Sequence, residues 1–158
     1  MAGSPLHKFM RLPAADRSLL IHSVLLVGAA RLALWTLPFN TVRRLFARRS
    51  RQSPAPYPTT ERIGWAISVA KRFIPKGNCL PQALAAESLL MRGGHPVEFR
   101  IGVAKTDDGR LEAHAWVESG GRLVVGDLTQ GLATLTPLPP LPASRADLPR
   151  PDSRLPTP

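Results

Sequence analysis

Two kinds of hydrophobic periodicity divide the middle of the chain into a helix followed by strands. Between residues 80 and 91 apolar residues recur at helical spacing, and Gly93-Gly94 supplies a flexible C-cap. Asn78 is a suitable N-cap, and Pro81 falls in the first turn, where its missing N–H is not needed. The pattern therefore predicts a helix that begins at or next to Cys79.

After residue 96 the pattern changes to alternation of apolar and polar residues, which is typical of half-buried strands. One alternating run covers residues 97–103 and a second covers residues 111–118, with a turn signal at 107–109 between them. Gly120-Gly121 is a two-residue loop of the kind that closes a hairpin, and a third strand follows it. We therefore expect an α+β fold in which the helix packs on an antiparallel sheet.

The expected hairpin register brings two polar residues face to face. If Ser119 pairs with Arg122, His114 stands directly opposite Asp127, with Cβ atoms roughly 5 Å apart. A carboxylate in that position holds an imidazole in the tautomer that a general base needs. Cys79 would lie at the positive end of the helix dipole, which favours the nucleophilic thiolate. The spacing therefore predicts a catalytic triad of Cys79, His114 and Asp127.

Each of these three residues also has a purely structural interpretation. A lone cysteine is more often a small buried hydrophobe than a nucleophile. A histidine in a strand is usually a satisfied polar residue, and an aspartate that closes a strand is commonly a turn former. A helix-start cysteine, a strand histidine and a cross-strand aspartate in this order favour the catalytic interpretation.

A resemblance to a known family rests on four segments and the aspartate that follows them: Cys79–Ala85, His95–Val97, Ile101–Val103, His114–Glu118 and Asp127. In these segments the chain resembles the leader peptidase of lasso-peptide biosynthesis, a transglutaminase-like cysteine protease. The resemblance is close over roughly residues 62–128. It is looser over Leu12–Arg17 and Leu37–Phe39, which are similar to the helical lead-in of that family.

The resemblance implies a papain-related core and a Cys-His-Asp triad that works through a thioester without a cofactor or metal. The reaction it implies is removal of the leader from a ribosomally made precursor, after which a separate ATP-dependent cyclase closes the ring. The implied partners are the precursor peptide, a separate leader-recognition protein and the cyclase. The second oxyanion donor is not identified, because residues 71–78 contain no Gln and Gln82 lies after the cysteine.

Composition agrees with one intracellular domain. A chain of 158 residues buries one ordinary core, and a single cysteine leaves no disulfide framework or metal-type cluster. The first residues lack the features of a signal peptide, so we expect a cytoplasmic protein. The formal net charge of +10 comes mainly from residues 1–51, which hold nine Lys and Arg and one acid.

The segment Ser18–Trp35 is apolar, but His22 and Arg31 interrupt it. We interpret it as an amphipathic helix packed on the core, with Asp16 as its N-cap. A membrane-surface helix is the alternative, supported by the basic residues from Arg43 to Arg51. Because no aromatic-interleaved groove accompanies these arginines, we expect a solvated or partner-docking surface, with neither nucleic acid nor a membrane as partner.

We divide the chain into three parts. Residues 1–60 form a helical, basic lead-in with a Pro-rich linker, residues 61–135 form the peptidase core, and residues 136–158 form a Pro-rich tail that is extended or disordered. The core is expected to open with a helix over Glu61–Phe73. Two other functions stay open: a transglutaminase-like acyltransferase, which uses an amine in place of water, and a non-catalytic binding module that uses the basic N-terminus.

Overall fold

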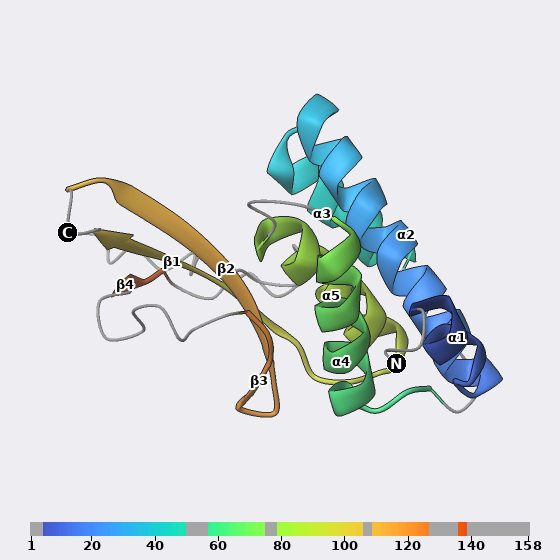
Figure 1. Cartoon of the computed structure of the whole chain (residues 1–158). Helices are drawn as coiled ribbons and strands as arrows, with labels where there is room; N and C mark the ends of the chain where they lie inside the picture. The colour runs from blue at the N-terminus through green and yellow to red at the C-terminus, as the bar shows by residue number, and fades with distance from the viewer. Residues whose placement is uncertain (1–4, 50–56, 75–78, 106–108, 127–135, 139–158) are drawn as a thin grey trace, which may run out of the picture.

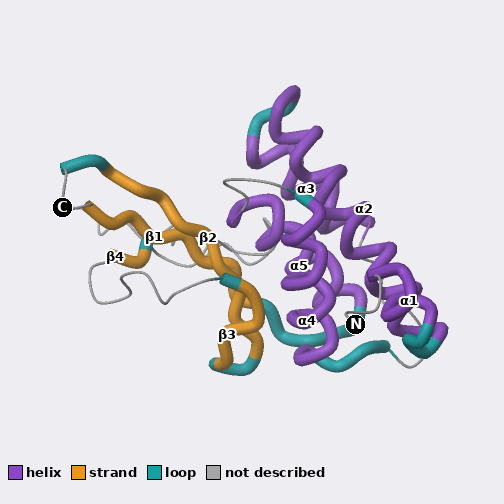
Figure 2. Tube along the Cα trace, viewed as in Figure 1, coloured by secondary structure: helices purple, strands orange, loops and turns teal. Residues whose placement is uncertain are grey.

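The computed structural model describes residues 5–49, 57–74, 79–105, 109–126 and 136–138, which form an α+β fold (Figure 1). Its elements in chain order are α1 (Pro5–Met10), α2 (Ala14–Thr36), α3 (Phe39–Arg49), α4 (Thr60–Ala70), the 3-10 turn η1 (Lys71–Phe73), α5 (Cys79–Arg92), β1 (Glu98–Lys105), β2 (Leu111–Ser119), β3 (Arg122–Val125) and β4 (Thr136–Pro137). The helices stand together on one side and the antiparallel sheet, of order β3-β2-β1-β4, lies on the other (Figures 1 and 2). The predicted α+β class is confirmed.

Helix α5 is the centre of the molecule. Every residue from Pro81 to Leu90 is buried, because α2, α3 and α4 pack around the helix and the sheet covers its remaining side. Its alanines let these neighbours approach closely, and the backbone turns away after the helix at Gly94, which has φ of 70°. The helix begins at Cys79, as predicted, while the expected N-cap Asn78 lies outside the described residues.

Helix α4 packs on α5 through the apolar stripe that the sequence predicts: Ile63, Ala66, Ile67 and Ala70, all fully buried. The Thr59 side chain caps the helix by accepting a hydrogen bond from the backbone N–H of Arg62. The predicted continuation to Phe73 is a tighter 3-10 turn, η1.

Helix α2 packs on α4 and α5 with one face only. Leu19, Leu20, Val27 and Ala30 are buried in the same core cluster as the residues of α5 and the sheet. The prediction of Asp16 as N-cap is wrong. The helix begins earlier, at Ala14 after Pro13, and the Asp16 carboxylate instead forms an ion pair with Arg62 of α4.

The sheet is built on the predicted hairpins. The turn between β2 and β3 is the expected two-residue loop, because Ser119 pairs with Arg122 and both intervening glycines have positive φ, 56° at Gly120 and 75° at Gly121. Strand β4, at the start of the Pro-rich segment, is extended along the outer edge of β1.

The register between β2 and β3 shifts by one residue inside the ladder. Glu118 pairs with Leu123, but Val117 pairs with Val125, so Val124 is the extra residue of a β-bulge. The bulge coincides with a close helix-to-strand contact, since a Cβ on Gly64 of α4 would lie 2.7 Å from the Val124 carbonyl oxygen. Helix α4 thus packs directly against the bulged backbone.

The bulge corrects the uniform register from which His114 was placed directly opposite Asp127. That register is wrong from Val117 onward, and β3 ends at Val125 without reaching the level of His114. Asp127 itself lies outside the described residues.

One buried ion pair ties α3 to α5. The guanidinium of Arg43 donates to the carboxylate of Glu87 from Nε at 3.1 and 3.2 Å and from Nη2 at 2.7 Å. It also lies over the ring of Phe99, 4.9 Å from the ring centroid, and so reaches β1. Burial raises the pKa of Glu87, and the hydrogen bond and charge of Arg43 oppose this rise. The ion pair with Arg43 therefore allows the Glu87 carboxylate to be charged inside the core.

Replacement of Arg43 should cost stability in a pH-dependent way. Arg43→Met leaves Glu87 buried without its counter-ion and should lower the free energy of unfolding by about 3–5 kcal/mol near neutral pH. Without Arg43 the Glu87 pKa rises further above its unfolded value. The carboxyl is protonated in both states below the unfolded pKa, so the loss should be small there and grow as pH rises through the folded pKa. Urea unfolding across the acid-to-neutral range measures it.

Arg44→Met is the matched control, because Arg44 is exposed and its guanidinium only bonds the Asn40 carbonyl. It should change the free energy of unfolding by less than about 0.5 kcal/mol. The double variant Arg43→Met, Glu87→Leu should recover most of the lost stability. An equal loss for Arg43→Met at acid and neutral pH would show that Glu87 ionisation is not its cause.

Candidate active site

Cys79 lies where the start of α5 meets the middle of β2. Its thiol is free and half-buried, and its Sγ is 4.0 Å from the carbonyl oxygen of Ala113. Ala113 immediately precedes His114, so the fold brings the thiol to the strand position next to the predicted base. Because α5 is buried on every side beyond its first turn, this position is set by the packing of the whole helix.

His114 faces away from the apolar core. Strand alternation places its side chain on the same sheet face as Trp116 and Glu118, whereas Ala115 and Val117 belong to the core cluster. The imidazole stacks against the Trp116 ring, with centroids 6.5 Å apart and planes at 22°. Its Nε2 is buried and has no hydrogen-bond partner among the described residues. Nε2 therefore makes no hydrogen bond to the Cys79 thiol in this structure.

A set of polar side chains that the sequence interpretation missed holds Trp116 in place. The indole Nε1 donates to Glu118 Oε1 at 2.9 Å, and Arg100 of β1 pairs with Glu118 at 3.2 Å and with Glu98 at 2.6 Å. The strand register could have revealed these contacts, because Arg100 is the direct cross-strand partner of Trp116. These contacts orient the ring on which the imidazole stacks.

Gly102 of β1 is the direct cross-strand partner of His114. It carries no side chain, so nothing from that position covers the imidazole on its own sheet face. Gly102 is itself buried, between His114 of β2 and Pro137 of β4.

The end of β3 runs close to the same tryptophan. Gly126 has φ of 133°, and a Cβ there would lie 2.4 Å from the Trp116 Cβ. Only glycine fits this contact. Asp127 follows directly in the sequence; its role as the third member of the triad stays a prediction.

Gln82 lies one turn after Cys79 and is 8% exposed. It lines a cavity of about 220 Å³ between α4, the start of α5 and the end of β3, together with Lys71, Ser68 and Gly126. The side-chain amide of Gln82 is therefore buried one helical turn from the Cys79 thiol. Among the described residues no group of three His, Cys, Asp or Glu side chains could hold a metal ion.

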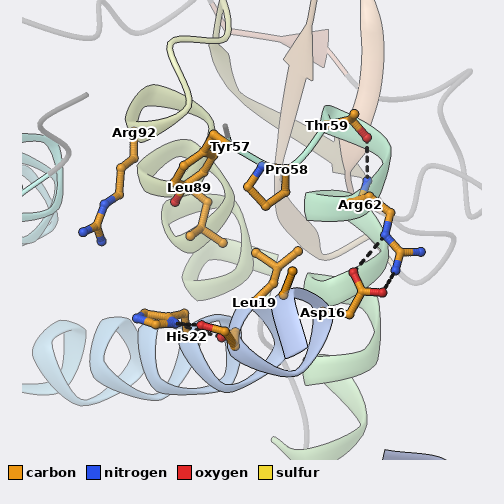
Figure 3. A pocket seen from close by; sticks show the side chains of 11 residues that line it. Asp16, Leu19, His22, Tyr57, Pro58, Thr59, Arg62, Leu89 and Arg92 are labelled. Atoms are coloured by element: carbon orange, nitrogen blue, oxygen red, sulfur yellow. Dashed lines mark hydrogen bonds and ion pairs between the residues drawn. The ribbon is translucent and has the colours of Figure 1, made fainter. Parts of the chain in front are cut away.

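A larger pocket of about 530 Å³ lies at the other end of α5 (Figure 3). In its lining Asp16 pairs with Arg62, and His22 Nδ1 lies 2.8 Å from the Ser18 carbonyl oxygen. Burial raises the pKa of Tyr57 there, and the Arg92 charge opposes the rise. The pocket contacts Leu89 near the helix C-terminus, whereas Cys79 is the first helix residue, so it is not part of the thiol site.

The transglutaminase-like superfamily model matches residues 24–139, well over half of the chain. The protein therefore belongs to the transglutaminase-like superfamily, whose members are typically cysteine-dependent enzymes. The match includes α5, which carries Cys79, and β2, which carries His114. Searches among characterised proteins and among solved structures give no match.

The Gly126 contact predicts a stability difference between two glycines. Gly126→Ala must accommodate both a positive φ and a clash with Trp116, and should lower the free energy of unfolding by roughly 2–4 kcal/mol. Gly120→Ala also has a positive φ, but no atom lies within 4 Å of its added Cβ, so it should cost only about 1–2 kcal/mol. Thermal unfolding of both variants measures the difference, and equal losses would show that the Trp116 contact does not constrain the strand end.

Proposed function

We propose that this protein is a cysteine peptidase that removes the leader from a ribosomally made lasso-peptide precursor, acting through Cys79, His114 and Asp127. The observation that carries the proposal is the meeting of α5 with β2. It sets the only cysteine of the chain 4.0 Å from the backbone next to His114, whose Nε2 is buried and has no partner in the described ranges. Membership of a superfamily of cysteine-dependent enzymes supports the same chemistry.

In the proposed reaction His114 takes the proton of Cys79, and the thiolate attacks the carbonyl carbon at the end of the leader. The backbone N–H of Cys79 donates to the oxyanion that forms. The C–N bond breaks as His114 gives the proton to the departing amine, leaving the leader as a thioester on Sγ. Water activated by His114 then hydrolyses the thioester, which restores the thiol and releases the leader carboxylate.

The substrate and partners follow from the sequence resemblance. A separate leader-recognition protein would deliver the precursor, so that affinity comes mainly from the raised effective concentration at the thiol. Recognition at the cut would depend on a small residue, threonine in much of the family, just before the last residue of the leader. The freed amine would then be the substrate of the ATP-dependent cyclase.

A transglutaminase-like acyltransferase is the second candidate, because the superfamily match applies equally to it. It would form the same thioester and resolve it with an amine in place of water. The two candidates differ in product mass: a peptidase yields two fragments whose masses sum to precursor plus water, whereas an acyltransferase yields a conjugate of acyl donor and amine. A binding module would leave every mass unchanged.

The test is mass spectrometry of the precursor after incubation with the full chain and the leader-recognition protein. Cys79→Ala should abolish cleavage, and His114→Ala should slow it by about 10²–10⁴-fold. Asp127→Asn should also slow it strongly, since the wrong imidazole tautomer becomes available. The control is His22→Gln, an exposed histidine on α2 that should leave the rate unchanged.

Intact precursor in the presence of confirmed partner binding would contradict the peptidase. Conjugate formation that needs Cys79 would assign the acyltransferase instead. Cleavage that survives Cys79→Ala would place the chemistry outside this site.

A further inference from the structure

The outer face of α2 is apolar although it faces away from the core. Ile21, Leu25, Leu32 and Trp35 are 49%, 64%, 67% and 86% exposed. With Gly28 they follow one another at intervals of four and three residues, so they form one straight stripe about 21 Å long. We call these five residues the α2 stripe. The buried positions of α2 lie on the opposite side of the helix.

The apolar surface continues from the α2 stripe into a groove. The groove has a volume of about 710 Å³ and is lined by residues of α1, α2, α4 and η1, including Phe9, Leu25, Trp65 and Phe73. Phe73 is itself 67% exposed. Among the described residues Arg72 is the only charged side chain in the lining. An apolar surface that extends over several elements marks an interaction site.

The N-terminal segment that carries this surface is strongly positive. Residues 1–51 contain nine Lys and Arg and a single acid, Asp16, whose carboxylate pairs with Arg62. Arg72, which is exposed, lines the groove. A second copy of the chain would bring an equally basic face against this one, so like charges oppose self-association. The surface instead fits a partner with an anionic surface layer over an apolar interior.

We propose that the α2 stripe and the groove bind the surface of an anionic lipid bilayer. The stripe would lie at the boundary between headgroups and acyl chains, with Trp35 in the interfacial region that tryptophan favours. Arg72 would face the lipid phosphates, which attract a basic residue near the surface. The inference is independent of the reaction at Cys79.

The helix lies on the bilayer and does not cross it. α2 has the length and apolar composition of a membrane span, with a mean hydropathy of 1.7 over its most apolar window. Its inner face, however, supplies Leu19, Val27 and Ala30 to the core, and a crossing helix would have to leave that core. Only 28% of the window is buried inside the fold.

The test is co-sedimentation of the full chain with vesicles. We expect binding to phosphatidylcholine vesicles that contain about 30% phosphatidylglycerol, at least about tenfold tighter than to pure phosphatidylcholine. Leu32→Glu and Trp35→Glu should each weaken binding at least about tenfold, and Arg72→Gln about fivefold. The matched control is Leu111→Glu on β2, which is 74% exposed and should bind as the native chain does.

Circular dichroism should show native folding for these variants, because all the replaced side chains are exposed. Tryptophan fluorescence should shift to the blue on anionic vesicles, and Trp35→Phe should reduce that shift, with Trp65 in the groove contributing the remainder. Absence of binding, or binding that Leu32→Glu leaves unchanged, would overturn the proposal. A stable dimer in lipid-free solution that Leu32→Glu dissociates would also overturn it, by assigning the stripe to a second copy.

Discussion

The complete burial of α5 is the constraint on which the rest of this structure depends. A helix with no exposed side from Pro81 to Leu90 cannot shift or rotate without displacing α2, α3, α4 and the sheet together. The same burial requires the Glu87 carboxylate to have a partner, which Arg43 supplies from a separate helix. The thiol at the first position of α5 is therefore as rigidly placed as the core itself, which is a condition for oriented nucleophilic attack.

The sheet side of the site is held in a different way. There the imidazole of His114 lies against Trp116, and the indole is fixed by Glu118 and Arg100 on a polar face. The predicted nucleophile is thus positioned by apolar packing, and the predicted base by a ring that a hydrogen-bonded network orients. Such a division allows the polar face to adjust to a substrate while the helix does not move.

Local sequence signals predicted the elements that depend on local physics. The Gly93-Gly94 cap, the α4 stripe and the Gly120-Gly121 loop each follow from neighbouring residues alone, and the structure confirms them. The bulge at Val124 could not be predicted in this way, because it coincides with a contact to Gly64, sixty residues earlier in the chain. The pairing of Arg43 with Glu87 is non-local for the same reason.

The α2 helix shows a second limit of periodicity. Where almost every position is apolar, the pattern cannot distinguish the buried side from the exposed one, and only the positions of α4 and α5 decide it. Part of the candidate site could be predicted from the sequence, because the helix start and the strand alternation placed Cys79 on α5 and His114 on β2. The supporting contacts of Trp116 required the strand register that the structure provides.

The two residues of β4 have a consequence for the solubility of the protein. They cover β1 at Gly102 and Val103, where a bare strand edge would otherwise present free N–H and C=O groups to other chains. One of the two is Pro137, which has no N–H to offer to a further strand. Among the described residues β4 thus covers the middle of the β1 edge with a strand whose own outer edge lacks one N–H donor.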